Sequence, residues 1–286
     1  MESCPEQAQT NNANRAPAPL LFVTAAGIIF IDFSTSNHQR QVIAMTEELE
    51  EVAPPEVHHY DEIGEVPWDI QNYWKQRHRI FTKYEEGVWL TDDAWFGVTP
   101  ESIATKIAEH ISTSAPKDKV VLIDAFAGAG GNSIAFAKSG RWKRVYAIEK
   151  NPAVLACAKH NAKIYGVDTK ITWFEGDCFE ILKTHLKDLG PFSVVFASPP
   201  WGGPGYRSDE IFNLQTMEPY SLDHLYKEYS IFSKHIVLYL PRTSDLRQLA
   251  KLVDDGKQVI VEHYCMEGAS KALCAYYGDF KLSLSD

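Results

Sequence analysis

The stretch VVLIDAFAGAGGN, residues 120–132, joins an apolar run to a glycine-rich turn and then to the start of a helix. Residues 120–124 have the length and apolar content of a buried strand. Gly128, Gly130 and Gly131 let the backbone turn tightly and approach a ligand closely. The helix expected at 132–139 would present free N–H groups at the end of that strand. This succession predicts the first unit of an α/β sheet.

The same alternation continues almost to the end of the chain. Six more strands are expected, at 144–149, 171–175, 192–197, 235–240, 258–264 and 271–277, and four more helices at 152–165, 179–186, 222–230 and 244–252. Short apolar strands separated by amphipathic helices pair in parallel through right-handed crossovers. We therefore predict a doubly wound, mostly parallel, seven-stranded Rossmann-like sheet. The last two strands lack an intervening helix, so they are expected to form an antiparallel hairpin at one edge.

The region before this sheet predicts a small helical extension and an appendage. Residues 68–84 are basic and aromatic at helical spacing, which predicts a short helix that Gly87 ends. A second helix is expected with Thr99 as N-cap and Pro100 at its first position, running to Ile111. Residues 1–19 have the composition of a disordered segment. We predict an acidic, partly disordered appendage at 1–64, a helical extension at 65–115 and the sheet domain at 116–286.

Residues 20–33 are mostly apolar but include Asp32. They are shorter than the roughly 20 residues that a membrane span needs. They are read either as a short strand or hairpin added to the fold or as a poorly ordered appendage.

Charge and cysteine usage narrow the class of protein. The 286 residues carry a net charge of −10, but residues 1–64 hold ten acidic and two basic residues and account for −8 of it. The remainder is nearly neutral, which argues against a broad phosphate-binding face and leaves room for a local basic pocket. The five cysteines are widely spaced and contain no C-x-x-C pair. We expect neither a disulfide framework nor a metal site, and a reducing compartment.

Three carboxylates follow three successive predicted strands: Asp124, Glu149 and Asp177. Asp124 would repel a pyrophosphate but suits a cationic group, such as that of S-adenosylmethionine. Glu149 can accept from both hydroxyls of a ribose, and Asp177 from an adenine amino group. Each carboxylate taken singly could instead be a helix N-cap. Together they favour binding of a nucleoside that carries a positive charge.

The loop SPPWGGP, residues 198–204, follows the fourth strand, and five of its seven residues are Pro or Gly. Such a loop is stiff and cannot continue a helix. It would present Ser198 and Trp201 at the sheet edge where open α/β folds bind ligands. The alternative is a tight turn with Trp201 packed into the core.

From about Tyr73 to Phe280 the chain resembles the trimethylguanosine synthase family of class I S-adenosylmethionine-dependent RNA cap methyltransferases. The matching segments are YWxQR at 73–77, RIF at 79–81, WFxVTPE at 95–101, DAFxGxGGN at 124–132, SPPWGGP at 198–204, LPR at 240–242 and AYYGD at 275–279. SPPWGGP is far more specific than the glycine turn, which many methyltransferases share. Residues 1–64 lie outside the resemblance.

The resemblance implies that methyl groups pass from S-adenosylmethionine to N2 of the 7-methylguanosine cap on small nuclear and nucleolar RNAs. Two transfers would give the 2,2,7-trimethyl cap. It also implies a cap-binding role for 65–115, a nuclear or nucleolar location, and small nuclear and nucleolar ribonucleoprotein proteins as candidate partners. We expect a monomer and no membrane association.

The resemblance also implies roles for individual residues. The catalytic residues are Ser198, Pro199 and Trp201. The cofactor-binding residues are Phe81, Thr99, Asp124, Ala125, Phe126, Gly128, Gly130, Asn132, Glu149, Asp177, Cys178 and Ser198. The substrate-binding residues are Trp201, Lys75, Arg77, Tyr206 and Arg242.

This sequence departs from the family pattern at three positions. Asn72 stands where a phosphate-contacting Lys is common, with Lys75 as the candidate to compensate. Gly97 stands where a Ser is common, and Glu149 replaces the more usual Asp.

Two other functions stay open at this point. One is methyl transfer to an unmethylated guanine or adenine within RNA or DNA, with the Ser-Pro-Pro-Trp loop used as Asp/Asn-Pro-Pro-Tyr loops are used. The other is a non-catalytic module that binds caps or adapter proteins.

Overall fold

The computed structural model describes the backbone of Leu20–Thr24 and Gly27–Ile31, and residues 53–202, 210–254, 258–266 and 268–282. The chain forms two compact units, Met1–Val52 and Ala53–Asp286. In the first unit, β1 (Leu20–Thr24) pairs antiparallel with β2 (Gly27–Ile31). The apolar stretch therefore forms a hairpin. The disorder expected at 1–19 lies outside the described residues.

The second unit is built on a seven-stranded sheet in the order β5-β4-β3-β6-β7-β9-β8. Its strands are β3 (Val121–Asp124), β4 (Arg144–Glu149), β5 (Ile171–Glu175), β6 (Ser193–Ala197), β7 (Ile236–Pro241), β8 (Ile260–Met266) and β9 (Ala269–Tyr277). The strands β3 to β7 pair in parallel, and β9 runs antiparallel to both β7 and β8. The predicted sheet and its antiparallel edge hairpin are confirmed.

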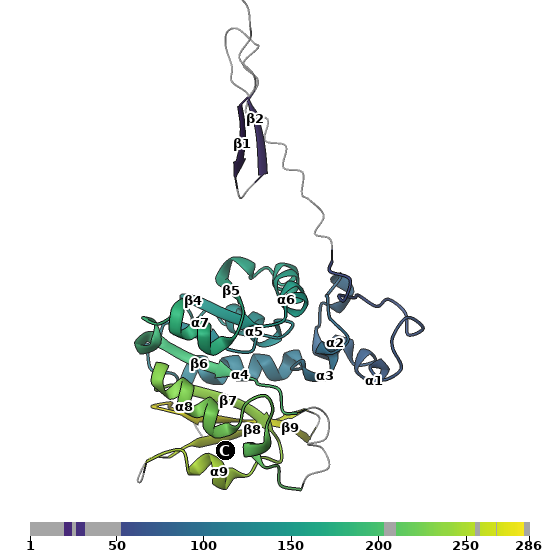
Figure 1. Ribbon diagram of the computed structural model, residues 1–286. Coiled ribbons are helices and arrows are strands. Elements are labelled where there is room, and N and C mark those ends of the chain that lie inside the picture. The colour runs from purple at the N-terminus through teal and green to yellow at the C-terminus, as the bar shows by residue number, and fades with distance from the viewer. Residues whose placement is uncertain are drawn as a thin grey trace, which may run out of the picture. The chain divides into compact units, whose positions relative to one another are not determined.

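Helices cover both faces of this sheet (Figure 1). They are α4 (Glu101–Ser114), α5 (Gly131–Lys138), α6 (Pro152–Ile164), α7 (Cys178–Thr184), α8 (Leu222–Phe232) and α9 (Leu246–Ala250). Leu122 belongs to the core on the side of α4 and α5, and its neighbour Ile123 to the core on the side of α7 and α8. Successive strand residues thus point into opposite cores, which is why the strands read as continuous apolar runs.

The part of the extension that precedes α4 contains short helical turns, gathered at one side of the larger unit (Figure 1). They are α1 (Gln71–Trp74), α2 (Arg77–Ile80), η1 (Tyr84–Glu86) and α3 (Ala94–Gly97). The single helix predicted over 68–84 is therefore wrong. The indole of Trp74 donates to the carbonyl of Tyr60 at 3.0 Å. This contact ties the end of α1 to the segment that precedes the extension.

The start of α4 also differs from the prediction. Pro100, not Thr99, is its N-cap residue, and the helix runs to Ser114, beyond Ile111. The Thr99 hydroxyl instead accepts a hydrogen bond from Asn132 Nδ2 at 3.1 Å. The Thr99 side chain thus bonds to Asn132 of α5 and does not cap α4.

The larger unit begins at Ala53, and His58 forms an antiparallel bridge with Leu90. Residues 53–64 thus pack with the extension. The three-part division at residues 64 and 115 stays a prediction. Among the described helices, none has the length and hydropathy of a membrane span.

Candidate active site

Asp124 ends β3, and its side chain is completely buried. Its Oδ2 accepts a hydrogen bond from Ser133 Oγ at 2.6 Å. Oδ1 has no hydrogen-bond partner within the described part of the chain. Burial raises the pKa of Asp124 to about 7 and the nearby charge of Glu149 adds to the rise, whereas the Ser133 hydrogen bond and the nearby backbone N–H of Phe126 act in the opposite direction. A buried acceptor without a donor is costly, so this position is suited to a cationic donor from a ligand.

The glycine turn lies against α6 and beside Glu149. Gly128 and Gly130 have φ angles of +53° and +94°, which side-chain-bearing residues rarely adopt. The N–H of Gly128 donates to Glu149 Oε2 at 2.9 Å, and Glu149 Oε1 accepts from the N–H of Asn151 at 2.9 Å. Each oxygen of Glu149 has a second lone pair. The carboxylate can therefore still accept from a ribose.

Asp177 is the N-cap of α7. Its Oδ1 accepts from the N–H groups of Phe179 and Glu180 at 3.0 and 3.3 Å. Its Oδ2 accepts from the hydroxyl of Tyr220 at 2.7 Å. Burial acts to raise the pKa of Asp177, but the hydrogen bonds outweigh it and the pKa is lowered. Asp177 is therefore a helix N-cap, which is one of the two alternatives predicted for it. The second lone pair of Oδ2 can still accept a hydrogen bond from an adenine amino group.

Two neighbours of Asp177 refine the predicted nucleoside site. Cys178 is buried with Sγ 3.5 Å from the hydroxyl of Tyr229, and burial raises its thiol pKa to about 12. Its side chain belongs to the core, so any contact with a cofactor would have to come from its backbone. Tyr220 was missed from the sequence, because nothing local marks it. The fold brings its ring to 6.4 Å from that of Phe126.

The extension reaches the glycine turn through Thr99 and Phe81. A Cβ on Gly131 would lie 3.4 Å from the carbonyl oxygen of Thr99. Phe81 is 2% exposed and lines one pocket together with Gly131 and Tyr165. The structure thus brings both residues to the start of α5. The Oδ1 of Asn132 is a second buried acceptor without a partner among the described residues.

The Ser-Pro-Pro-Trp segment follows β6, as predicted. Ser198 is half-buried and Pro199 is buried. The half-buried Trp201 donates from Nε1 to the carbonyl of Tyr239 on β7 at 3.3 Å, and the two rings lie 5.7 Å apart. The indole therefore packs against both hydrophobic cores while part of it stays exposed, so the structure keeps elements of both predicted alternatives. Residues 203–209, including the predicted substrate ligand Tyr206, lie outside the described residues.

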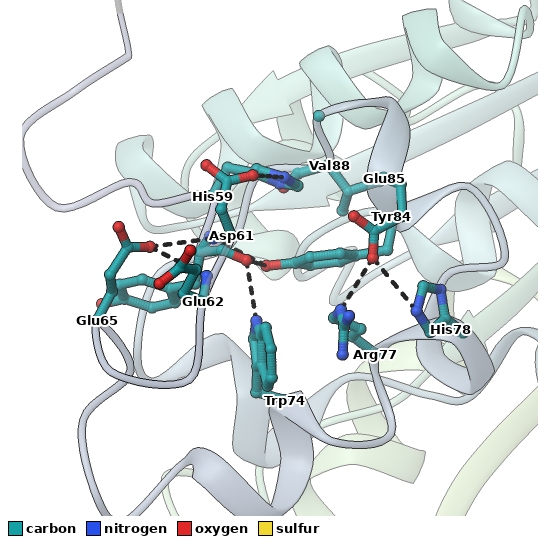
Figure 2. Close-up of polar contacts among 12 residues, drawn as sticks. His59, Asp61, Glu62, Glu65, Trp74, Arg77, His78, Tyr84, Glu85 and Val88 are labelled. Carbon is teal, nitrogen blue, oxygen red and sulfur yellow. Dashed lines mark hydrogen bonds and ion pairs between the residues drawn. The ribbon is translucent and has the colours of Figure 1, made fainter.

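The predicted phosphate ligands have different surroundings. The guanidinium of Arg77 lies 3.9 Å from the centre of the Trp74 ring and donates to Glu85 Oε1 at 3.1 Å. His78 Nε2 approaches the same oxygen at 3.2 Å (Figure 2). Arg77 is thus already paired within the chain. Lys75 and Arg242 are exposed, the latter directly after β7.

The described residues contain no group of three or more His, Cys, Asp or Glu side chains placed to hold a metal ion. The candidate site consists of carboxylates, a glycine turn and an aromatic ring that follow the carboxyl ends of β3, β4, β5 and β6.

Comparisons with known proteins identify the family. Residues 119–280 match the family described as RNA cap guanine-N2 methyltransferase. A trimethylguanosine synthase of Schizosaccharomyces pombe is 36% identical over 213 residues, covering 74% of this chain and 87% of the relative. The Saccharomyces cerevisiae protein of the same name is 35% identical over 181 residues, covering 63% of this chain and 56% of the relative.

A solved structure supports the fold alone. A crystal structure described as a methyltransferase from Porphyromonas gingivalis aligns with a TM-score of 0.55 at 15% identity, covering 74% of this chain and 51% of that one. The family match and the Schizosaccharomyces pombe relative together show that the chain belongs to the RNA cap guanine-N2 methyltransferase family of S-adenosylmethionine-dependent enzymes.

Proposed function

We propose that this protein methylates N2 of the 7-methylguanosine cap on small nuclear and nucleolar RNAs, twice, to give 2,2,7-trimethylguanosine. Both yeast relatives are named trimethylguanosine synthase. The observation that carries the proposal is the placement of Trp201, three residues after Ser198 and held by the carbonyl of Tyr239. An aromatic face and a polar acceptor thus follow the same strand.

The residues of the nucleoside site suit S-adenosylmethionine. Its sulfonium supplies an electrophilic methyl group when it is bound. Asp124 Oδ1, buried and without a partner in the described chain, would accept from its ammonium group. Glu149 would take the ribose hydroxyls, and Asp177 Oδ2 the adenine amino group.

Trp201 would select the methylated base. A guanine methylated at N7 carries a positive charge, which an indole face attracts by about 0.5–2 kcal/mol beyond the effect of buried area. An unmethylated guanine has no such charge. The stack would therefore distinguish a cap from an internal guanine.

Ser198 and Pro199 would orient the nucleophile. The N2 amine is weakly nucleophilic because its lone pair is delocalised into the ring. Ser198 Oγ and the Pro199 carbonyl can each accept a hydrogen bond from the N2 amine. These two bonds would direct the nitrogen lone pair toward the methyl group. Alignment would supply most of the acceleration. The bond from sulfur to the methyl group breaks as the bond from N2 forms, S-adenosylhomocysteine leaves, and the acidic nitrogen would release its proton to water.

The cap triphosphate would be held by Lys75 and Arg242, which are exposed. Arg77 would contribute only if a phosphate competes with Glu85. Because Asn72 replaces the usual Lys, Lys75 is the candidate on this side of the site.

The test compares two dinucleotide cap analogues that differ only in the N7 methyl group, each incubated with labelled S-adenosylmethionine. We expect label on the N7-methylated analogue alone and a product heavier by two methyl groups. Equal labelling of both analogues would contradict cap selectivity and favour a guanine within RNA or DNA. No binding of S-adenosylmethionine in a calorimetric titration would favour a non-catalytic module.

The proposed location is the nucleus, including the nucleolus, with small nuclear and nucleolar ribonucleoprotein proteins as partners and a monomer as the active form. The location and the partners follow from the resemblance to the family, whereas the monomeric state is our own expectation. Light scattering of the purified protein and microscopy of a tagged chain would test the oligomeric state and the location.

A further inference from the structure

Asn161 lies on α6 and is completely buried. Its Oδ1 accepts from the N–H of Trp89 at 2.8 Å, and its Nδ2 donates to the carbonyls of Trp89 and Ala129 at 2.9 and 3.0 Å. Both amide hydrogens and the amide oxygen are therefore used. The Asn161 amide exchanges two hydrogen bonds with the backbone of Trp89, as one β-strand residue does with another. Its second N–H donates to the Ala129 carbonyl.

The two partners of Asn161 belong to the two halves of the proposed site. Trp89 lies in the extension, whereas Ala129 is the middle residue of the glycine turn. Its neighbours are held elsewhere: Gly128 donates to Glu149, and a Cβ on Gly130 would lie 3.2 Å from Ala158 Cα. Among residues 128–130, Ala129 is thus the one that Asn161 connects to Trp89 of the extension.

Other contacts fix the extension on α6 without reaching the turn. The Trp89 ring stacks on His160 at 3.7 Å, and His160 Nε2 is 2.9 Å from the carbonyl oxygen of Gly87. Lys83 Nζ donates to the carbonyl of Ile164 at 3.1 Å. A second link between the two halves, from Asn132 to Thr99, lies on the other side of the turn.

We propose that Asn161 is a positioning residue that couples binding of the capped substrate to binding of the cofactor. A ligand that orders the extension also orders the Ala129 carbonyl, and a ligand that orders the turn also orders Trp89. The second ligand then meets a part of the chain that is already ordered, so each raises the affinity for the other. This inference rests on the proposed function, because it takes the extension as the substrate-binding half.

The test measures the dissociation constant of S-adenosylhomocysteine with and without a saturating 7-methylguanosine cap analogue. In the natural chain we expect the analogue to raise the affinity by about five-fold or more. Asn161→Asp keeps an acceptor for the Trp89 N–H but places an oxygen against two carbonyls, and Asn161→Ala removes all three bonds without adding a charge. We expect the increase to fall below about two-fold in both variants.

A matched control is Asn151→Ala at the N-cap of the same helix. The Asn151 side chain caps α6 by accepting from Ala153 and Val154, and it does not contact Trp89 or Ala129. This variant is expected to weaken the helix but to keep the coupling of the natural chain. Circular dichroism checks that each variant is folded, and Asn161→Ala remains informative if the buried charge of Asn161→Asp prevents folding.

Hydrogen exchange gives a reading that needs no cap analogue. S-adenosylhomocysteine should slow amide exchange over residues 84–98 in the natural chain and in Asn151→Ala, but not in the Asn161 variants. If the natural chain does not bind the cap analogue, the proposed function is contradicted. The hydrogen-exchange comparison still tests the role of Asn161, because it uses only S-adenosylhomocysteine. The coupling role is overturned if folded Asn161 variants show the same exchange response as the natural chain.

Discussion

Asp124 is the residue whose ionisation should control the binding of the cofactor. Its pKa is raised from 3.8 to about 7 by burial, and it must be ionised to hold an ammonium group. We therefore predict that the affinity for S-adenosylhomocysteine rises about ten-fold per pH unit below pH 7 and levels off above it. Calorimetry at several pH values measures this. Asp124→Asn should bind weakly without this pH dependence, and a flat profile in the natural chain would contradict the assignment.

The same shift bears on stability in the absence of ligand. A carboxyl whose pKa is raised by folding binds its proton more tightly in the folded state. Its contribution to stability is present below pH 3.8 and is lost as the pH rises through about 7. Above about pH 7 the ionised Asp124 destabilises the ligand-free protein most. This is also the pH range in which Asp124 must be ionised to bind an ammonium group, and the bound ammonium offsets the cost of the buried charge.

Trp201 is the residue that should separate cap binding from cofactor binding. In Trp201→Ala we expect the affinity for a 7-methylguanosine cap analogue to fall roughly 30-fold, from about 2 kcal/mol of lost stacking and cation–π attraction. The affinity for S-adenosylhomocysteine should change little. Fluorescence titrations with the two ligands measure both effects. Trp201→Phe is the control and should keep part of the cap affinity, whereas a large loss of cofactor affinity in Trp201→Ala would contradict the role.

At the scale of elements, the glycine turn between β3 and α5 depends on close approach to α6. Gly130→Ala would place a Cβ 3.2 Å from Ala158 Cα at a φ of +94°. We expect a loss of about 1–2 kcal/mol in unfolding free energy from the backbone conformation alone, together with weaker cofactor binding. Urea unfolding and calorimetry would measure the two losses.

Gly97→Ala is the control for Gly130→Ala. Gly97 closes α3, and no atom lies within 4 Å of its added Cβ. Its unfolding free energy should stay within about 0.5 kcal/mol of the natural value. Equal effects of the two substitutions would show that approach to α6 does not govern the turn.

At the scale of the molecule, every described residue assigned to the site lies in the unit that begins at Ala53. We predict that a chain spanning residues 53–286 unfolds at the same temperature as the full chain and labels the cap analogue at a similar rate. Thermal denaturation and the labelling assay test this. A shortened chain that binds S-adenosylhomocysteine yet fails to label the analogue would assign residues 1–52 a part in the reaction.

The seven strands, their alternation with helices, the glycine turn and the Ser-Pro-Pro-Trp segment could all be predicted from the amino-acid sequence. These features are local: an apolar run, a helical period or a Pro/Gly cluster is legible within a few neighbouring residues. The strands at 144–149 and 171–175 have the predicted bounds for the same reason. The carboxylates at three strand ends could be placed together because parallel strands end at one edge.

The hydrogen-bond partners of these side chains could not be predicted from the sequence and became known from the folded chain. The tertiary structure broke the expected helix at 68–84, moved Thr99 from a cap to Asn132 and paired Arg77 with Glu85. It also brought Tyr220 to Asp177, and Asn161 to Trp89 and Ala129. Most of these partners are distant in sequence. No local pattern encodes such pairs, because they form only when packing of the sheet and helices brings the two segments within hydrogen-bond distance.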